Sequence, residues 1–214
     1  MTADIQPSLG DRLPIGGTAL QAKIAAAAIE LFYSQGSVAT TVREITAACG
    51  LTPGALYNHF ASKDHLLYVL VRDIHLQVDA QMAATLANSG PNPADQLAAT
   101  VRLLVGHSAG FRKQSRVANR EFTFLTGPWR QEVRDIRRQI RDRMTGILLA
   151  GAERAVFALA GGDDLASATL SSVTITNMCV HISAWALENY PLTISDLQDR
   201  YAQIALRVAG ARPG

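Results

Sequence analysis

Two helix N-termini are predicted within twelve residues, one at Thr41 and one at Thr52, and they determine the fold of the N-terminal part of the chain. Thr41 and Glu44 have the spacing of a capping box, in which the threonine hydroxyl accepts from the backbone N–H of Glu44 and the carboxylate accepts from that of Thr41. Thr52 followed by Pro53 begins another helix, because proline at the first helical position loses no hydrogen bond. Gly50 lies in the turn between them. The segment therefore predicts a helix-turn-helix.

The rest of the chain also predicts helices. Apolar residues recur at helical spacing, the composition is rich in alanine, and no Asn-Gly hairpin signal occurs. We therefore expect an all-α fold of nine helices, with an N-terminal three-helix helix-turn-helix domain followed by a helical bundle. The nine helices are predicted to begin near Thr18, Thr41, Pro53, Ser62, Asn92, Gln114, Trp129, Asp164 and Ser195. Four of them are predicted to end near Ala87, Leu125, Leu159 and Glu188.

The composition is that of a globular chain, with 48% hydrophobic and 18% charged residues. The N-terminus lacks the pattern of a secretory signal, and no run of about 18 consecutive apolar residues predicts a membrane span. Cys49 and Cys179 lie far apart, which favours reduced thiols in the cytoplasm. We expect no membrane partner, no metal and no cofactor.

The positive charge is unevenly distributed. Residues 1–66 carry four Lys and Arg against five Asp and Glu, whereas residues 112–143 carry ten against four. A DNA-binding surface is normally basic, so the charge does not lie where the helix-turn-helix predicts the DNA.

The sequence from Thr40 to Asp64, TTVREITAACGLTPGALYNHFASKD, closely resembles the N-terminal signature of the TetR family of transcriptional regulators. With the preceding helix, the resemblance covers about Ala22 to Leu70. It implies a ligand-responsive, dimeric regulator of double-stranded operator DNA, most simply a repressor. It also implies a DNA-binding domain (18–64) and a helical ligand-binding and dimerisation domain (65–214). Residues 1–17 are rich in Gly, Pro and Asp without periodicity, which predicts a disordered arm.

The family's DNA contacts correspond to residues on the predicted second and third helices and at the start of the fourth. They are Arg43, Thr52, Pro53, Gly54, Ala55, Tyr57, Asn58, His59 and Lys63. Some of these have a structural alternative: Tyr57 can pack against the turn, His59 can be a structural histidine, and Lys63 can be a solvated charge. Gly54 departs from the larger polar residues of some members, which leaves more of the base recognition to Arg43.

After Leu70 the resemblance weakens, and it implies only that the last two helices pair with those of a second subunit. Residues at helical spacing predict that dimer face, with an internal core as the alternative: Leu165, Ala168, Ser172, Ile175, Ala186, Leu197, Tyr201, Ile204 and Val208. Aromatic, Met and polar residues predict an apolar ligand pocket: Phe111, Phe122, Phe124, Trp129, Met144, Asn177, Met178, His181 and Trp185.

The arginine-rich segment 112–143 allows two interpretations. One is a solvated helix face. The other is recognition of an anionic ligand such as an acyl-coenzyme A. The first is the default, and the second rests on a loose likeness of Asn119-Arg120-Glu121-Phe122 and of Arg134 with Arg137-Arg138 to lipid-responsive TetR members.

We expect a small apolar or acyl-CoA-like effector. Two alternatives stay open: a DNA-binding protein without an effector, or an enzyme that uses the bundle cavity. No phosphate loop, zinc-protease motif or nucleophile elbow supports the enzyme. The operator, the effector, the regulated genes and the direction of the response are not predicted.

Overall fold

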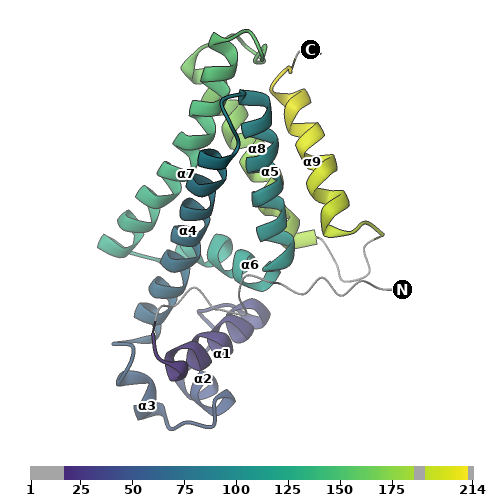
Figure 1. Ribbon diagram of the computed structural model, residues 1–214. Coiled ribbons are helices and arrows are strands. Elements are labelled where there is room, and N and C mark those ends of the chain that lie inside the picture. The colour runs from purple at the N-terminus through teal and green to yellow at the C-terminus, as the bar shows by residue number, and fades with distance from the viewer. Residues whose placement is uncertain (1–16, 186–190, 212–214) are drawn as a thin grey trace.

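The computed structural model describes residues 17–185 and 191–211, and within these ranges the chain is all-α (Figure 1). Nine α-helices and one 3-10 turn form there, without a strand. Their bounds are α1 Ala19–Gln35, α2 Val42–Ala48, α3 Pro53–Tyr57, α4 Lys63–Asn88, α5 Pro93–Gly110, α6 Arg112–Glu121, η1 Phe122–Phe124, α7 Gly127–Glu153, α8 Leu165–Trp185 and α9 Ile194–Val208. The prediction of an all-α, nine-helix fold is confirmed for these ranges.

The first three helices and the start of α4 form a small domain with its own apolar core. The predicted capping box is present: Thr41 Oγ1 accepts from the N–H of Glu44 at 3.2 Å, and the N–H of Thr41 donates to the Glu44 carboxylate at 2.7 Å. Thr52 has the extended conformation of a helix cap but makes no side-chain capping bond. Leu56 is fully buried and thereby anchors the short α3 to the domain.

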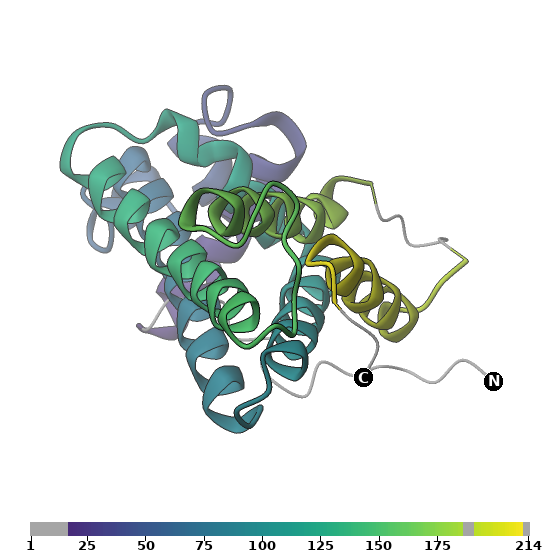
Figure 2. The same cartoon turned by 90° about the horizontal axis from the view of Figure 1, so that it is seen from above.

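The remaining helices form a bundle, which α4 joins to the small domain (Figure 1). Within the bundle α5 packs most extensively against α9, and α7 packs against α4 and α8. Seen from above, α9 lies on the side of the bundle away from α7 (Figure 2). α6 contacts both α1 and the bundle helices α4, α5 and α8, so it lies at the junction of the two domains.

The prediction that the seventh helix runs to about Leu159 is wrong, because α7 ends at Glu153. Ala155 adopts a left-handed φ of 55°, and the N–H groups of Val156 and Phe157 both donate to the carbonyl of Gly151. The fully buried ring of Phe157 thereby folds back onto the helix end. The sixth helix also differs from its prediction: it ends at Glu121, and the 3-10 turn follows.

α8 is long and apolar enough, by length and composition, to cross a membrane, contrary to the prediction that no segment has this property. In the structure it packs against α5, α6 and α7. The predicted arm lies, except for Gly17, outside the described residues, as does the predicted end of the eighth helix near Glu188.

Candidate DNA-binding surface and ligand cavity

The predicted DNA contacts lie on an outward face of the small domain. Of these residues, Ala55, His59 and Lys63 are half-buried, and the others are exposed: Arg43, Thr52, Pro53, Gly54, Tyr57 and Asn58. Tyr57 keeps 55% of its surface exposed, although a tyrosine that packed the turn would be buried. Leu56 and Phe60 instead supply the buried side of this segment. The arrangement leaves the N-terminus of α3 and its small residues free to approach a duplex.

Lys63 has a structural role in the isolated chain. Its ammonium group donates to the carbonyl of Ser37 at 2.6 Å and to that of Thr40 at 2.7 Å. These bonds fix the connection between α1 and α2 to the start of α4. An ammonium group has three N–H donors, so one remains for a phosphate.

A cavity of about 350 Å³ lies among α4, α5, α6, α7 and α8. Two of the residues predicted for the ligand pocket, Phe122 and Asn177, line it. Its apolar wall is formed by side chains such as Ile74, Val78 and Leu104. Ligand pockets typically occupy about 300–1,000 Å³, so the volume suits a small molecule or part of a larger one.

The other predicted pocket residues do not line this cavity. Phe111 lies at a separate, more open pocket of about 640 Å³ beside α4, α5 and α9. Trp129 stacks on Tyr68 with the ring centroids 5.2 Å apart, and Met144 is fully buried in the bundle core. Met178 and Trp185 pack partly buried against that core, and His181 and Phe124 are exposed. Residue type alone gave a cluster that the fold does not bring together.

Arginines form the polar wall of the cavity. The list of predicted pocket residues omits them, although the anionic-ligand interpretation of segment 112–143 named Arg134, Arg137 and Arg138. Arg134, Arg137, Arg138 and Arg141 all line it, and the described residues that line it include no Asp or Glu. Their spacing of three, four and seven residues along α7 places them on one helix face. That spacing is the signal in the sequence that identifies them.

Arg137 is held by three neighbours from α4, α6 and η1. Its Nη1 lies 3.0 Å from His75 Nε2 and donates to Asn119 Oδ1 at 3.2 Å. Its guanidinium lies over the ring of Phe122, 4.7 Å from the centroid. Burial lowers the pKa of Arg137, although arginine stays protonated at physiological pH.

Two buried histidines line the cavity in their neutral form. Burial, aided by the positive charge of Arg137, lowers the pKa of His75 to about 4. Burial also lowers the pKa of His107 to about 4. The Nδ1 of His107 lies 3.2 Å from Ser115 Oγ. Thr176, which lines the same cavity, has a buried hydroxyl oxygen with no hydrogen-bond partner.

α6 lines this cavity and also contacts the small domain at α1. Its residues Ser115, Ala118 and Asn119 line the cavity. Further along the same helix the carboxylate of Glu121, only 1% exposed, accepts from the N–H of Ser37 at 3.0 Å and from its hydroxyl at 2.5 Å.

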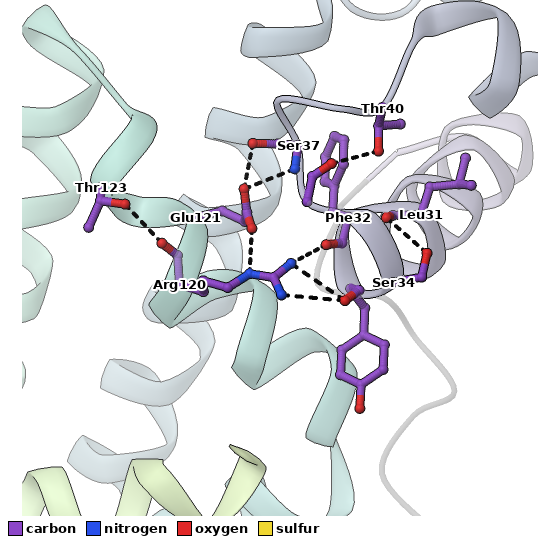
Figure 3. A network of polar contacts seen from close by, with 10 residues as sticks. Leu31, Phe32, Ser34, Ser37, Thr40, Arg120, Glu121 and Thr123 are labelled. Carbon is purple, nitrogen blue, oxygen red and sulfur yellow. Dashed lines mark hydrogen bonds and ion pairs between the residues drawn. The ribbon is translucent and has the colours of Figure 1, made fainter.

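Arg120 completes the connection between the two domains. Its Nε donates to Glu121 at 2.6 Å, and its Nη2 donates to the carbonyl of Phe32 at the end of α1 (Figure 3). Arg120 and Glu121 thus join α6 directly to the end of α1 and to the connection between α1 and α2.

The other basic residues of segment 112–143 also have structural partners. Arg112 donates to the carbonyl of Ser183, and Arg116 donates to that of Ala184, both at the C-terminal end of α8. Lys113 pairs with Glu30 on α1 at 2.5 Å. The positive charge of this segment thus joins helices and lines the cavity.

Several residues of the predicted dimer face belong to the monomer's own core. Ala168, Ser172, Ile175 and Leu197 are buried in the single chain, which bears out the internal-core alternative for these positions. Tyr201 and Val208 pack partly buried against the same core, and Ala186 lies outside the described residues. The large apolar residues exposed on α8 and α9 are Leu165, Leu170, Val173 and Ile204.

Comparisons with solved structures give the fold. A bacterial regulatory protein of the tetR family from Rhodococcus RHA1 superposes with a TM-score of 0.83 at 31% identity, covering 92% of this chain and 100% of that one. AibR, solved with isovaleryl coenzyme A and operator DNA, superposes with a TM-score of 0.78 at 20% identity, covering 90% and 99%.

Among curated proteins, the transcriptional repressor KstR2 of Rhodococcus jostii is 30% identical over 139 residues, which span 61% of this chain and 64% of that relative. KstR2 of Mycobacterium tuberculosis is 26% identical over 183 residues, 84% of this chain and 87% of that protein.

Two family models match, and together they cover both domains. The model for bacterial regulatory proteins of the tetR family matches residues 24–69, and the tetracyclin repressor-like C-terminal domain matches residues 90–209, more than half of the chain. The chain belongs to the TetR family of DNA-binding transcriptional regulators.

Proposed function

We propose that this regulator is a cytoplasmic, dimeric repressor that releases its operator when a ligand occupies the cavity beside α6. The observation that supports it most directly is the double contact of α6. One part of the helix lines the cavity, and its end binds Ser37 of the DNA-binding domain. A ligand that shifts α6 therefore changes the relative populations of DNA-binding and released conformations.

DNA contact in this proposal comes from α3 and its flanks. The N-terminus of α3 approaches the major groove, with Thr52 and Gly54 nearest the bases and Tyr57 at the backbone. Arg43, exposed on α2, adds a charged contact. Two copies, paired through α8 and α9, would place two recognition helices on half-sites one helical turn apart.

For the effector we propose a molecule with an apolar body and an anionic group, such as an acyl-CoA thioester. The cavity supports this with apolar side chains on one wall and arginines on the other. AibR, which shares the fold, was solved with an acyl-CoA and operator DNA, and KstR2 is a repressor. A regulator without an effector remains the second candidate function.

The test uses the full chain and a duplex selected by the protein itself from random DNA. Fluorescence polarisation then measures the affinity for that duplex during titration with acyl-CoA thioesters of increasing chain length. We expect at least one thioester to release the DNA. If the protein selects no duplex sequence, the regulator proposal fails. If DNA binds but no thioester weakens that binding, the acyl-CoA effector proposal fails.

A further inference from the structure

We propose that the cavity of this regulator recognises a carboxylate on the buried end of its ligand, through a bidentate pair with Arg137. This inference deepens the proposed function, because it specifies the chemistry of the ligand that the same cavity binds. It distinguishes an acid with an apolar body from a wholly apolar ligand.

The hydrogen bonds of Arg137 leave one edge of its guanidinium free. The two N–H groups of Nη1 are directed to His75 Nε2 and Asn119 Oδ1, at 3.0 Å and 3.2 Å. Among the described residues, neither Nε nor Nη2 has a partner. These two nitrogens share the side-on edge of the guanidinium, which matches the two oxygens of a carboxylate.

The neighbours of Arg137 hold that edge in place before any ligand binds. The Nδ1 of His75 lies 2.7 Å from the carbonyl of Val71, which fixes its N–H there and leaves Nε2 as the acceptor for Arg137. The ring of Phe122 packs against the guanidinium face. A donor pair that is already oriented loses little conformational entropy when a ligand binds.

The electrostatics of the cavity also favour an anion. Two of the arginines that line it are paired, Arg138 with Asp135 at 3.1 Å and Arg141 with Asp142 at 3.0 Å. Arg134 and Arg137 have no carboxylate partner among the residues that the structure describes. Arg134 is exposed to solvent, whereas Arg137 is partly buried. A partly buried charge without a counter-ion is unfavourable, so an entering carboxylate supplies the partner that Arg137 lacks.

The experiment compares two eight-carbon probes, octanoate and 1-octanol, by isothermal titration calorimetry on the full-length dimer. They share the apolar chain and differ in the carboxylate. We expect octanoate to bind at least about tenfold more tightly than octanol, as two charge-assisted hydrogen bonds allow. Arg137→Gln should remove this preference, whereas Arg143→Gln, on the same helix but outside the cavity lining and paired with Asp79, should keep it.

Arg137→Lys provides a second variant if Arg137→Gln does not fold, because lysine keeps the charge and lacks the fork. It too should reduce the preference for octanoate. Equal binding of the two probes, or full octanoate affinity in both Arg137 variants, would overturn the inference. A further comparison uses two CoA thioesters. Octanoyl-CoA has no carboxylate on its acyl chain, whereas the CoA monothioester of the eight-carbon diacid keeps one at the far end. Binding of the second distinguishes a CoA ester that retains a carboxylate from a free acid as the ligand.

The two proposals fail in different ways. If octanoate binds through Arg137 but no carboxylate or thioester changes the DNA affinity, the carboxylate site stands and the proposed regulation is wrong. If a thioester releases DNA equally from the native chain and from both Arg137 variants, the regulation stands and the carboxylate site is wrong.

Discussion

Replacing Glu121 by glutamine removes the charge from a carboxylate that is 1% exposed and that joins α6 to the DNA-binding domain. One carboxylate oxygen accepts from both the N–H and the hydroxyl of Ser37, and the other accepts from Arg120. All three partners are donors at this point. The glutamine side chain has one oxygen and one NH₂ group in place of the two carboxylate oxygens. In either orientation, its NH₂ group therefore faces an N–H of Ser37 or of Arg120, and that N–H loses its acceptor.

The structure sets the magnitude of the loss. Hydrogen bonds to a charged group contribute about 1.5–3 kcal/mol, whereas neutral ones contribute about 0.5–1.5. The two bonds from Ser37 each lose about 1 kcal/mol, and the amide facing a donor adds a similar cost. The Arg120 pair counts for less, because the side chain of Arg120 is 37% exposed and its charge is partly screened. We expect Glu121→Gln to destabilise the chain by about 2–3 kcal/mol.

Urea unfolding and thermal denaturation measure this change, with an expected fall in Tm of roughly 5–10 °C for a chain of this length. Ser37→Ala is the matched control, because it removes the hydroxyl and keeps the N–H donor, and it should cost about 1 kcal/mol. The ligand-induced change in DNA affinity should also shrink in Glu121→Gln. A Tm within about 1 °C of the native value would refute the assignment of Glu121 as the connection between the domains.

Three further changes test other parts of the structure. Arg43→Ala should weaken operator binding about tenfold in fluorescence polarisation, with no change in Tm because the side chain is exposed; unchanged affinity would exclude a DNA contact. The pKa values of His75 and His107 lie near 4 in the folded chain and near 6.5 in an unfolded one, so the unfolded chain binds more protons between these values. The free energy of unfolding should therefore fall as the pH drops from 6.5 towards 4, and it should fall less steeply in His75→Gln. Equal slopes of unfolding free energy against pH in the two proteins would contradict the burial of this histidine. Gly151→Ala would place a Cβ 2.0 Å from the buried ring of Phe157 and should lower the free energy of unfolding by about 1–3 kcal/mol. Gly146→Ala, with open space on the same helix, should be neutral or stabilising. Equal Tm values for the two variants would contradict the packing of Phe157 against Gly151.

The small domain could be predicted from the sequence because its boundaries depend on local chemistry. The capping box at Thr41 and the proline at the start of α3 act between residues close in the chain, so each appears in the sequence as a spacing. The end of α7 depends on the packing of Phe157 against Gly151, which forms only after the chain turns back. An alanine at position 155 gives no sign of the left-handed φ that this turn requires.

The cavity shows a different limit of sequence analysis. Aromatic and sulfur side chains suit both a pocket and a core, so composition could not separate Met144, which is buried in the core, from Phe122, which lines the cavity. Arginine is less ambiguous, because burying its charge requires a partner. The helical spacing of four arginines on α7 identifies one wall of the cavity, whereas Phe122 is the predicted aromatic residue that lines it.

Only the tertiary structure shows which of these arginines is available to a ligand. Arg138 pairs with Asp135 three residues before it, and Arg141 pairs with the adjacent Asp142. Because these partners are close in the sequence, spacing alone could indicate that Arg138 and Arg141 are already paired. The partners of Arg137 come instead from α4 and α6, and they occupy one nitrogen of its guanidinium while leaving the opposite edge unused. Because that asymmetry arises from helices that meet only in the folded chain, the carboxylate preference that we propose depends on how the bundle packs as well as on the residues that line the cavity.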